Sequence, residues 1–336
     1  MRLKYIDIAK GILILMVIYN HTGNLAVASG VDNDIINFIP KTSFFHSFFM
    51  PAFFIIAGMC SNYHKRFKDF AISNAKSLLI PAVLLLFVRI LVRYLFTGTF
   101  SRLEWSGLTS PTFIVNLGYW NWFLTALFTT KILFYIVLHT IINIKKRVAF
   151  CLITHVIGGI FYNLKGNDLG YYNFYFYQHA LLFLLYLEIG YDITQQNMKS
   201  FGLKINSIIF FVVYVSYLLI GRRIPSITSD PYLPTFDIIP HFFLSVCGSL
   251  MLIEFSKRVD SNPYLEDFGK NSLVVYCLHF QFMFSYYQIF KEQLNTMNFH
   301  HTITALFIMY VFTAFGSLWF SKMLKLKYLK WILGKF

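Results

Sequence analysis

The sequence predicts an all-α polytopic membrane protein with about ten transmembrane helices. The 336-residue chain is 57% hydrophobic and 20% aromatic. Only 13% of its residues are charged, against about a quarter in average soluble proteins, so a soluble domain could not hide its apolar surface. Apolar runs of membrane-spanning length recur along the chain, with no polar block large enough for a separate soluble domain. We therefore expect one transmembrane domain over residues 1–336.

Each predicted helix is an apolar segment near the length that crosses a hydrocarbon core about 30 Å thick. The first contains Ala26-Val27-Ala28, a small-x-small pattern like a signal-peptide cleavage site. However, the apolar stretch is long and is interrupted by Lys10, Asn20 and His21, which argues against a cleaved signal. The predicted spans are 6–28, 42–61, 78–98, 119–139, 148–163, 174–192, 205–221, 237–255, 272–290 and 302–320.

The distribution of lysine and arginine sets the predicted orientation. The termini and even-numbered loops carry 20 of the 29 Lys and Arg residues, the opposite loops carry six, and Arg89, Arg93 and Lys131 fall inside spans. Positive charge gathers on cytoplasmic loops, so both termini are expected in the cytoplasm. The formal charge of +14 is then mainly an orientation signal. We expect membrane lipid around the protein and no nucleic acid partner.

The four cysteines, Cys60, Cys151, Cys247 and Cys277, lie within apolar segments and lack metal-ligand spacing. We therefore expect neither disulfides nor a bound metal.

The first predicted helix carries a cation and an imidazole on one face. Lys10 and His21 are eleven residues apart, just over three turns or about 16 Å along the axis. An ionisable group near the middle of the membrane is costly and is a functional candidate. We predict that His21 is a general base, with Asn20 beside it in the catalytic site. The alternative for His21 is a hydrogen bond between helices that serves packing.

Lys10 is expected to receive an anionic donor that enters from the cytoplasm. Asp7 lies on the same helical face, and Lys76 stands at the cytoplasmic start of the third helix. We assign Lys10, Lys76 and Asp7 to the donor site, because lysine ammonium groups bind phosphate. Alternatively, Lys10 anchors the helix at the cytoplasmic membrane surface as a positive-inside residue, and Lys76 faces solvent or lipid headgroups.

Further intramembrane charges are candidates for a polar cavity. Arg89 lies roughly 13 Å beyond Ile80 by helical rise, too deep to snorkel, and is assigned a catalytic role. Arg93 shares its face, and we expect it to snorkel to the outer surface. Lys131 and Glu188 are assigned to substrate binding, with Glu188 also a candidate ion-pair partner.

Aromatic residues crowd the outer loops and helix ends, as in 119–123 and 171–177. An interfacial aromatic belt explains most of them. Asn121 and Trp122 are assigned to substrate binding, with Trp122 stacking against a sugar ring. His279, a second mid-helix imidazole, is assigned to the same function, and a structural role remains open for it.

Five sequence elements together resemble the integral-membrane acyltransferase 3 family, particularly its fucose 4-O-acetylase-like branch. Their order and spacing cover about residues 1 to 290. The elements are Asp7-Ile8-Ala9-Lys10-Gly11 with His21, residues 49–58 (FMPAFFIIAG), Leu78-Leu79-Ile80-Pro81, residues 121–127 (NWFLTAL) and residues 271–279 (NSLVVYCLH).

The chain also departs from the family pattern. Many members have arginine at the position of Lys10, and lysine keeps the charge but loses the bidentate fork. Many have an Arg-x-x-Arg pair before the third helix, where this chain offers only Lys76. Asn20 replaces a glycine that is frequent in the fucose-acetylase-like branch.

The resemblance implies transfer of an acetyl group from cytoplasmic acetyl-CoA, a co-substrate, to a hydroxyl of a cell-surface or lipid-linked glycan. It also implies a multi-pass protein of the cell inner membrane. A transporter or flippase for a glycan or small anion is the main alternative, because buried charges also line transport paths. Transporters commonly show two similar halves, and no internal repeat is apparent in this sequence. Three points remain open. The donor or acceptor could differ, the transfer could be direct or pass through an acyl-histidine intermediate, and the protein could form a homodimer.

Overall fold

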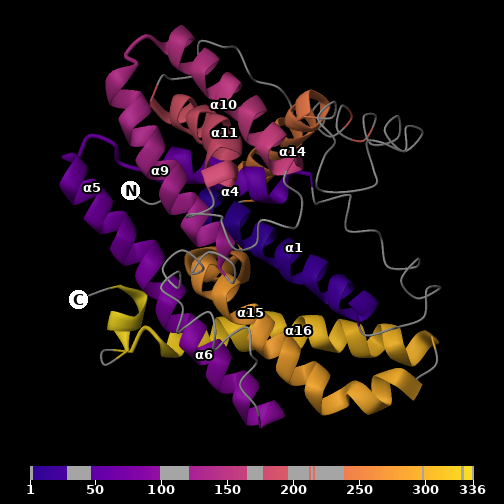
Figure 1. The fold of residues 1–336 in the computed structure, drawn as a ribbon. Helices are drawn as coiled ribbons and strands as arrows, with labels where there is room; N and C mark the ends of the chain where they lie inside the picture. The colour runs from indigo at the N-terminus through magenta and orange to yellow at the C-terminus, as the bar shows by residue number, and fades with distance from the viewer. Residues whose placement is uncertain are drawn as a thin grey trace. The chain divides into compact units, whose positions relative to one another are not determined.

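The computed structural model describes residues 3–28, 47–98, 121–164, 177–195, 212, 215, 238–259, 261–296, 299–326 and 329–334. Every regular element in these residues is a helix (Figure 1), which confirms the all-α expectation. The chain forms two compact units, each described here by itself. The first unit comprises Met1–His46, Val83–Ser110 and Val259–Phe336, and the second Ser47–Ala82 and Pro111–Arg258.

Nine of the ten predicted spans fall on helices, while the seventh, 205–221, lies outside the described residues apart from positions 212 and 215. Within the described part of the chain, three helices are long and apolar enough to cross a membrane, namely Phe67–Thr97, Trp122–Thr140 and His300–Met323. Phe49–Cys60 is a shorter apolar helix. The count of ten spans, the cytoplasmic termini and the single domain over 1–336 stay predictions.

In the first unit, α15 (Pro263–Thr296) packs against both α1 (Lys4–Ala28) and α16 (Phe299–Met323) (Figure 1). The backbones of α1 and α15 lie very close together. A Cβ atom added at Gly269 would overlap the carbonyl of Asp7, and one at Gly11 would overlap the carbonyl of Leu265. Small residues permit such an approach and so increase van der Waals contact between helices in lipid.

The same two helices meet again farther along, where the His21 ring lies 4.5 Å from the Phe280 ring between centroids. Contacts therefore run from Gly11 and Gly269 at one end to His21 and Phe280 at the other. We conclude that α1 and α15 run side by side in the same direction.

The long helix α15 begins at a strong local start signal. Asn262 is its N-cap: the backbone N–H of Leu265 donates to Asn262 Oδ1 at 3.0 Å, and the N–H of Glu266 donates to the Asn262 carbonyl at 2.9 Å. Pro263 occupies the first helical position, where its missing N–H costs no hydrogen bond.

In the second unit, α11 (Tyr177–Gln195) contacts three helices: α4 (Phe49–Cys60), α9 (Trp122–Thr140) and α10 (Ile144–Leu164). Glycines again bring backbones together, because a Cβ at Gly190 would overlap the Ile55 carbonyl. α14 (Ile238–Arg258) packs on the α4 side of this group.

A continuous helix runs from Phe67 to Thr97 through α5 (Phe67–Asn74), the π-helical turn η1 (Ala75–Leu79) and α6 (Ile80–Thr97). Pro81 explains the π turn. It has no N–H to donate to the carbonyl of Ser77 and its ring crowds that carbonyl, so a wider turn relieves the clash. The helix passes from the second unit to the first between Ala82 and Val83.

A buried charge cluster joins α10 to α11. The Nε of Arg147 donates to both oxygens of Glu188, at 2.7 and 2.9 Å, and its Nη2 donates to Asp192 at 3.1 Å. The side chains of Arg147 and Glu188 are only 5% and 1% exposed. Charges at this depth are tolerated because the guanidinium satisfies two carboxylates at once.

We predict that Gly269→Ala destabilises the protein by about 1–3 kcal/mol, because the new methyl group forces the α1 and α15 backbones apart. Gly316→Ala in the same unit is the matched control, since its Cβ would meet only the side chain of Phe282, which can rotate. Thermal unfolding in detergent measures both. Equal midpoints for wild type and Gly269→Ala would contradict the close packing.

We predict that Glu188→Ala costs about 3–5 kcal/mol, because the buried Arg147 guanidinium loses its main partner. The control Asp69→Ala breaks the exposed pair with Arg66, at 3.1 Å, and should cost at most about 1 kcal/mol. The same unfolding assay compares them. A Glu188→Ala protein as stable as the Asp69→Ala protein would show that the cluster does not stabilise the fold.

Candidate functional site

A pocket of about 280 Å³ lies in the first unit and contains His21. Three helices form it. α1 contributes His21 and Leu25, α6 contributes a face with two arginines, and α15 contributes the turn that follows His279. The lining residues in the described part of the chain are His21, Leu25, Arg89, Val92, Arg93, Phe280, Gln281, Met283 and Phe284. The structure therefore brings two of the three predicted catalytic residues, His21 and Arg89, into one cavity.

The arginines stand over aromatic rings of α15 at matching helical spacing. The Cζ atom of Arg89 lies 5.8 Å from the Phe280 ring centroid, and that of Arg93 lies 5.8 Å from the Phe284 ring centroid. Arg93 also lines the pocket, one turn beyond Arg89, and its snorkelling to the outer surface stays a prediction. Cation–π attraction orients both guanidinium groups at this apolar wall.

His279 lies beside His21, with ring centroids 5.2 Å apart. Its Nδ1 is 2.6 Å from the Tyr276 carbonyl, which can only accept, so Nδ1 carries the proton. In the neutral ring Nε2 is then the unprotonated nitrogen, and it has no hydrogen-bond partner among the described residues. The ring is fully buried and does not line the pocket. His279 therefore packs behind His21, and its assignment to substrate binding stays a prediction.

Asn20 is 4% exposed and does not line the pocket. Neighbouring residues of a helix point about 100° apart, so Asn20 and His21 face different directions. The Oδ1 atom of Asn20 has no hydrogen-bond partner in the part of the chain described. Its catalytic assignment stays a prediction.

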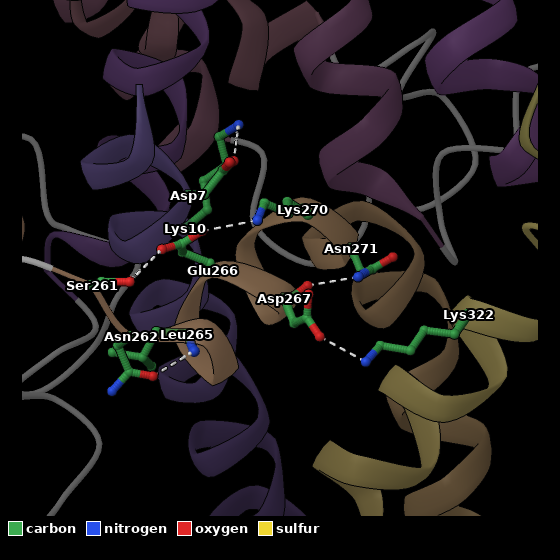
Figure 2. A network of polar contacts seen from close by, with 10 residues as sticks. All are labelled: Asp7, Lys10, Ser261, Asn262, Leu265, Glu266, Asp267, Lys270, Asn271 and Lys322. Carbon is green, nitrogen blue, oxygen red and sulfur yellow. Dashed lines mark hydrogen bonds and ion pairs between the residues drawn. The ribbon is translucent and has the colours of Figure 1, made fainter. Parts of the chain in front are cut away.

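Lys10 lies on the same helix as His21 and belongs to a polar network at the start of α15 (Figure 2). Its Nζ is 3.9 Å from Asp7 Oδ1. Nearby, Lys270 pairs with Glu266 at 2.9 Å and Lys322 with Asp267 at 2.7 Å. Lys10 keeps 24% side-chain exposure, whereas Asp7 has 3%. Lys10 therefore has the longest of these three ion-pair distances and a partly exposed side chain.

The ion pair between Glu266 and Lys270 also shifts the pKa values of both side chains. The hydrogen bond from Lys270 lowers the pKa of Glu266, and the reciprocal bond raises the pKa of Lys270. The charge of Lys4 also lowers the pKa of Glu266. The charge of Asp7 also raises the pKa of Lys270. Both residues of the pair are therefore charged at neutral pH.

The remaining predicted site residues belong to the second unit: Lys76, Asn121, Trp122, Lys131 and Glu188. Lys76 is exposed on the π turn. Asn121 donates to the Ala82 carbonyl at 2.8 Å, and Lys131 donates to Asn74 at 3.1 Å. The Trp122 ring is 5.0 Å from that of His179. Glu188 makes its ion pair with Arg147, and the binding functions of all five stay predictions.

Sequence reasoning missed several residues that the structure brings to these sites. Gln281, Phe280 and Phe284 line the pocket. The one local signal among them was the polar amide of Gln281 inside an apolar span. Arg147 was counted as a loop charge, but it is 4% exposed and anchors Glu188. No signal in the local sequence distinguishes Arg147 from its neighbours Lys145 and Lys146.

No cluster of three or more metal-ligating side chains occurs in the described residues. All four cysteines are free. Among the described residues, the pocket lining offers an imidazole, two guanidinium groups and an amide.

Comparison with known proteins supplies the family. No curated protein and no solved structure matches the chain. A family model described as an acyltransferase domain matches residues 3–322, nearly the whole chain. That match includes both Lys10 and His21, and it supports acyltransferase activity in a membrane protein. The chain belongs to the acyltransferase 3 family.

Proposed function

We propose that the protein is a membrane O-acetyltransferase that moves an acetyl group from cytoplasmic acetyl-CoA to a hydroxyl of a cell-surface or lipid-linked glycan. One observation carries the proposal. His21 lines a pocket with Arg89, while Lys10 lies about 16 Å away on the same face of α1. A donor held at Lys10 by its anionic nucleotide end can extend its thin pantetheine arm along this face towards His21.

Lys10 serves the donor through its partly exposed side chain and its long 3.9 Å pair with Asp7. Phosphate oxygens compete well for such a lysine, because charge-assisted hydrogen bonds are stronger than neutral ones. Asp7 orients Lys10, and a contact of Lys76 with the nucleotide stays a prediction.

His21 acts as the general base. It removes the proton of the acceptor hydroxyl as the oxygen attacks the thioester carbonyl carbon. The tetrahedral intermediate then collapses, the carbon–sulfur bond breaks, and the imidazolium returns the proton to the departing CoA sulfur. Arg89 stabilises the oxyanion, an effect of about 3 kcal/mol for a well-placed donor.

The acceptor occupies the far side of His21 from Lys10. Asn20 and His279 support the imidazole, and binding of the acceptor by Trp122, Asn121, Lys131 and Glu188 stays a prediction. The reaction takes place in the cell inner membrane and needs no metal.

We predict that His21→Ala lowers the rate of acetyl transfer by at least about 100-fold, because a general base typically contributes that much or more. Purified protein in nanodiscs, radiolabelled acetyl-CoA and a panel of glycans provide the assay. Label retained on the acceptor distinguishes an enzyme from a transporter. Label trapped on wild-type protein without acceptor identifies an acyl-histidine intermediate.

His64→Ala is the matched control for this variant, because His64 is exposed outside the pocket. It should transfer acetyl groups at the wild-type rate. A folded His21→Ala protein with near-normal transfer would overturn the proposed mechanism.

We predict that Lys10→Ala raises KM for acetyl-CoA about tenfold or more, because a charge-assisted contact to phosphate is lost. Lys10→Arg keeps the charge and should stay within a few-fold of wild type. Lys145→Ala removes an exposed lysine elsewhere and serves as control. Steady-state kinetics with varied donor measures the effect, and an unchanged KM in Lys10→Ala would exclude Lys10 from donor binding.

A further inference from the structure

Asp7 is a buried carboxylate with lysines near it on two helices. Its side chain is 3% exposed, and Lys10 Nζ lies 3.9 Å from its Oδ1 on α1. The backbone carbonyl of Asp7 meets Gly269 of α15, where an added Cβ would overlap it. Lys270 is the next residue of α15, so it leaves that helix beside Asp7 (Figure 2). The contact of the two helices therefore places a second cation next to the buried carboxylate.

Lys270 is held at this place by a carboxylate of its own helix. Its Nζ donates to Glu266 at 2.9 Å, one turn back along α15. That hydrogen bond raises the pKa of Lys270, and the nearby charge of Asp7 raises it further. An ammonium group has three N–H donors, so Lys270 can interact with both carboxylates at once. Lys10, Asp7, Lys270 and Glu266 thus alternate in charge across the contact of α1 with α15.

Asp7 competes with the donor for Lys10. A phosphate group that binds Lys10 must draw its ammonium group away from the carboxylate 3.9 Å away. Attraction between opposite charges is strong beside a buried group, where water screens it poorly. A second cation that offsets the charge of Asp7 weakens its hold on Lys10.

We propose that Lys270 is a positioning residue of the donor site, because it offsets the charge of Asp7 and so allows Lys10 to exchange Asp7 for a phosphate group of the donor. The inference rests on the proposed function and adds a residue that acts through Asp7 and Lys10 without itself binding the nucleotide. Gly269 and Lys270 then have linked tasks, since the glycine admits the α1 backbone and the lysine balances the carboxylate that this backbone carries.

The test measures binding of CoA, which carries no acyl group, so it does not depend on catalysis. Isothermal titration calorimetry of the full chain in phosphatidylcholine nanodiscs gives Kd for wild type and variants. Lys270→Gln should raise Kd for CoA about fivefold or more, because Asp7 then retains Lys10. Asp7→Asn should lower Kd, because Lys10 loses the competing carboxylate. Lys270→Arg keeps the charge and should stay within about twofold of wild type.

Double variants show whether Lys270 acts through Asp7 and Lys10. In the Asp7→Asn background, Lys270→Gln should change Kd by less than about twofold. The Lys10→Ala background gives a second, independent test with the same expectation, and it replaces the first if Asp7→Asn does not fold. Lys322→Gln is the matched control, because it removes another lysine of the network, paired with Asp267 at 2.7 Å, and should leave Kd unchanged. Thermal unfolding verifies that each variant is folded.

Three results would overturn the proposal. The first is an unchanged Kd in folded Lys270→Gln, and the second is an equal loss of affinity in Lys322→Gln. The third is a Lys270→Gln effect that persists in the double variants, because Lys270 would then bind the nucleotide directly. Lys10→Ala separates this inference from the proposed function. If Lys10→Ala binds CoA as tightly as wild type, or wild type binds no CoA, the donor site at Lys10 fails and the inference with it. Binding that is weakened in Lys10→Ala but not in Lys270→Gln refutes the inference alone.

Discussion

The close approach of α1 and α15 is the contact on which the candidate site depends. Gly11 and Gly269 lack the side chains that would hold the two backbones apart. Because the helices meet there, Glu266 and Lys270 lie in the same polar network as Lys10 (Figure 2), and Phe280 reaches His21 farther along. In lipid, where apolar burial adds little between helices, such backbone contact is a main source of association.

The protein handles charge inside its apolar fold in two different ways. Arg147 is surrounded by Glu188 and Asp192, so its charge is neutralised by protein groups and joins α10 to α11. Arg89 and Arg93 instead line a cavity whose walls supply aromatic rings and an imidazole. Removing one partner of a buried ion pair is strongly destabilising, whereas cations that line a cavity beside a base are suited to binding and chemistry. Glu188 thus joins α11 to α10 through Arg147, while the catalytic role of Arg89 and the binding role of Glu188 stay predictions.

Local features of the chain were predictable because short-range rules control them. The apolar composition predicted helices throughout, and nine predicted spans fall on helices. Lys10 and His21 share a face because one helix carries both, and the motifs around them indicated the family that the domain match confirms. Asn262-Pro263 is likewise a readable helix start.

The sequence by itself determined the helical class, the family and the alignment of Lys10 with His21. Only the tertiary structure decided that α6 and α15 complete the pocket, that Arg93 lines it, and that Arg147 pairs with Glu188 across 41 residues of sequence. Helical periodicity specifies which side chains share a face, but it does not specify which helix that face will meet. That choice depends on the packing of distant glycines and rings, which no local pattern encodes.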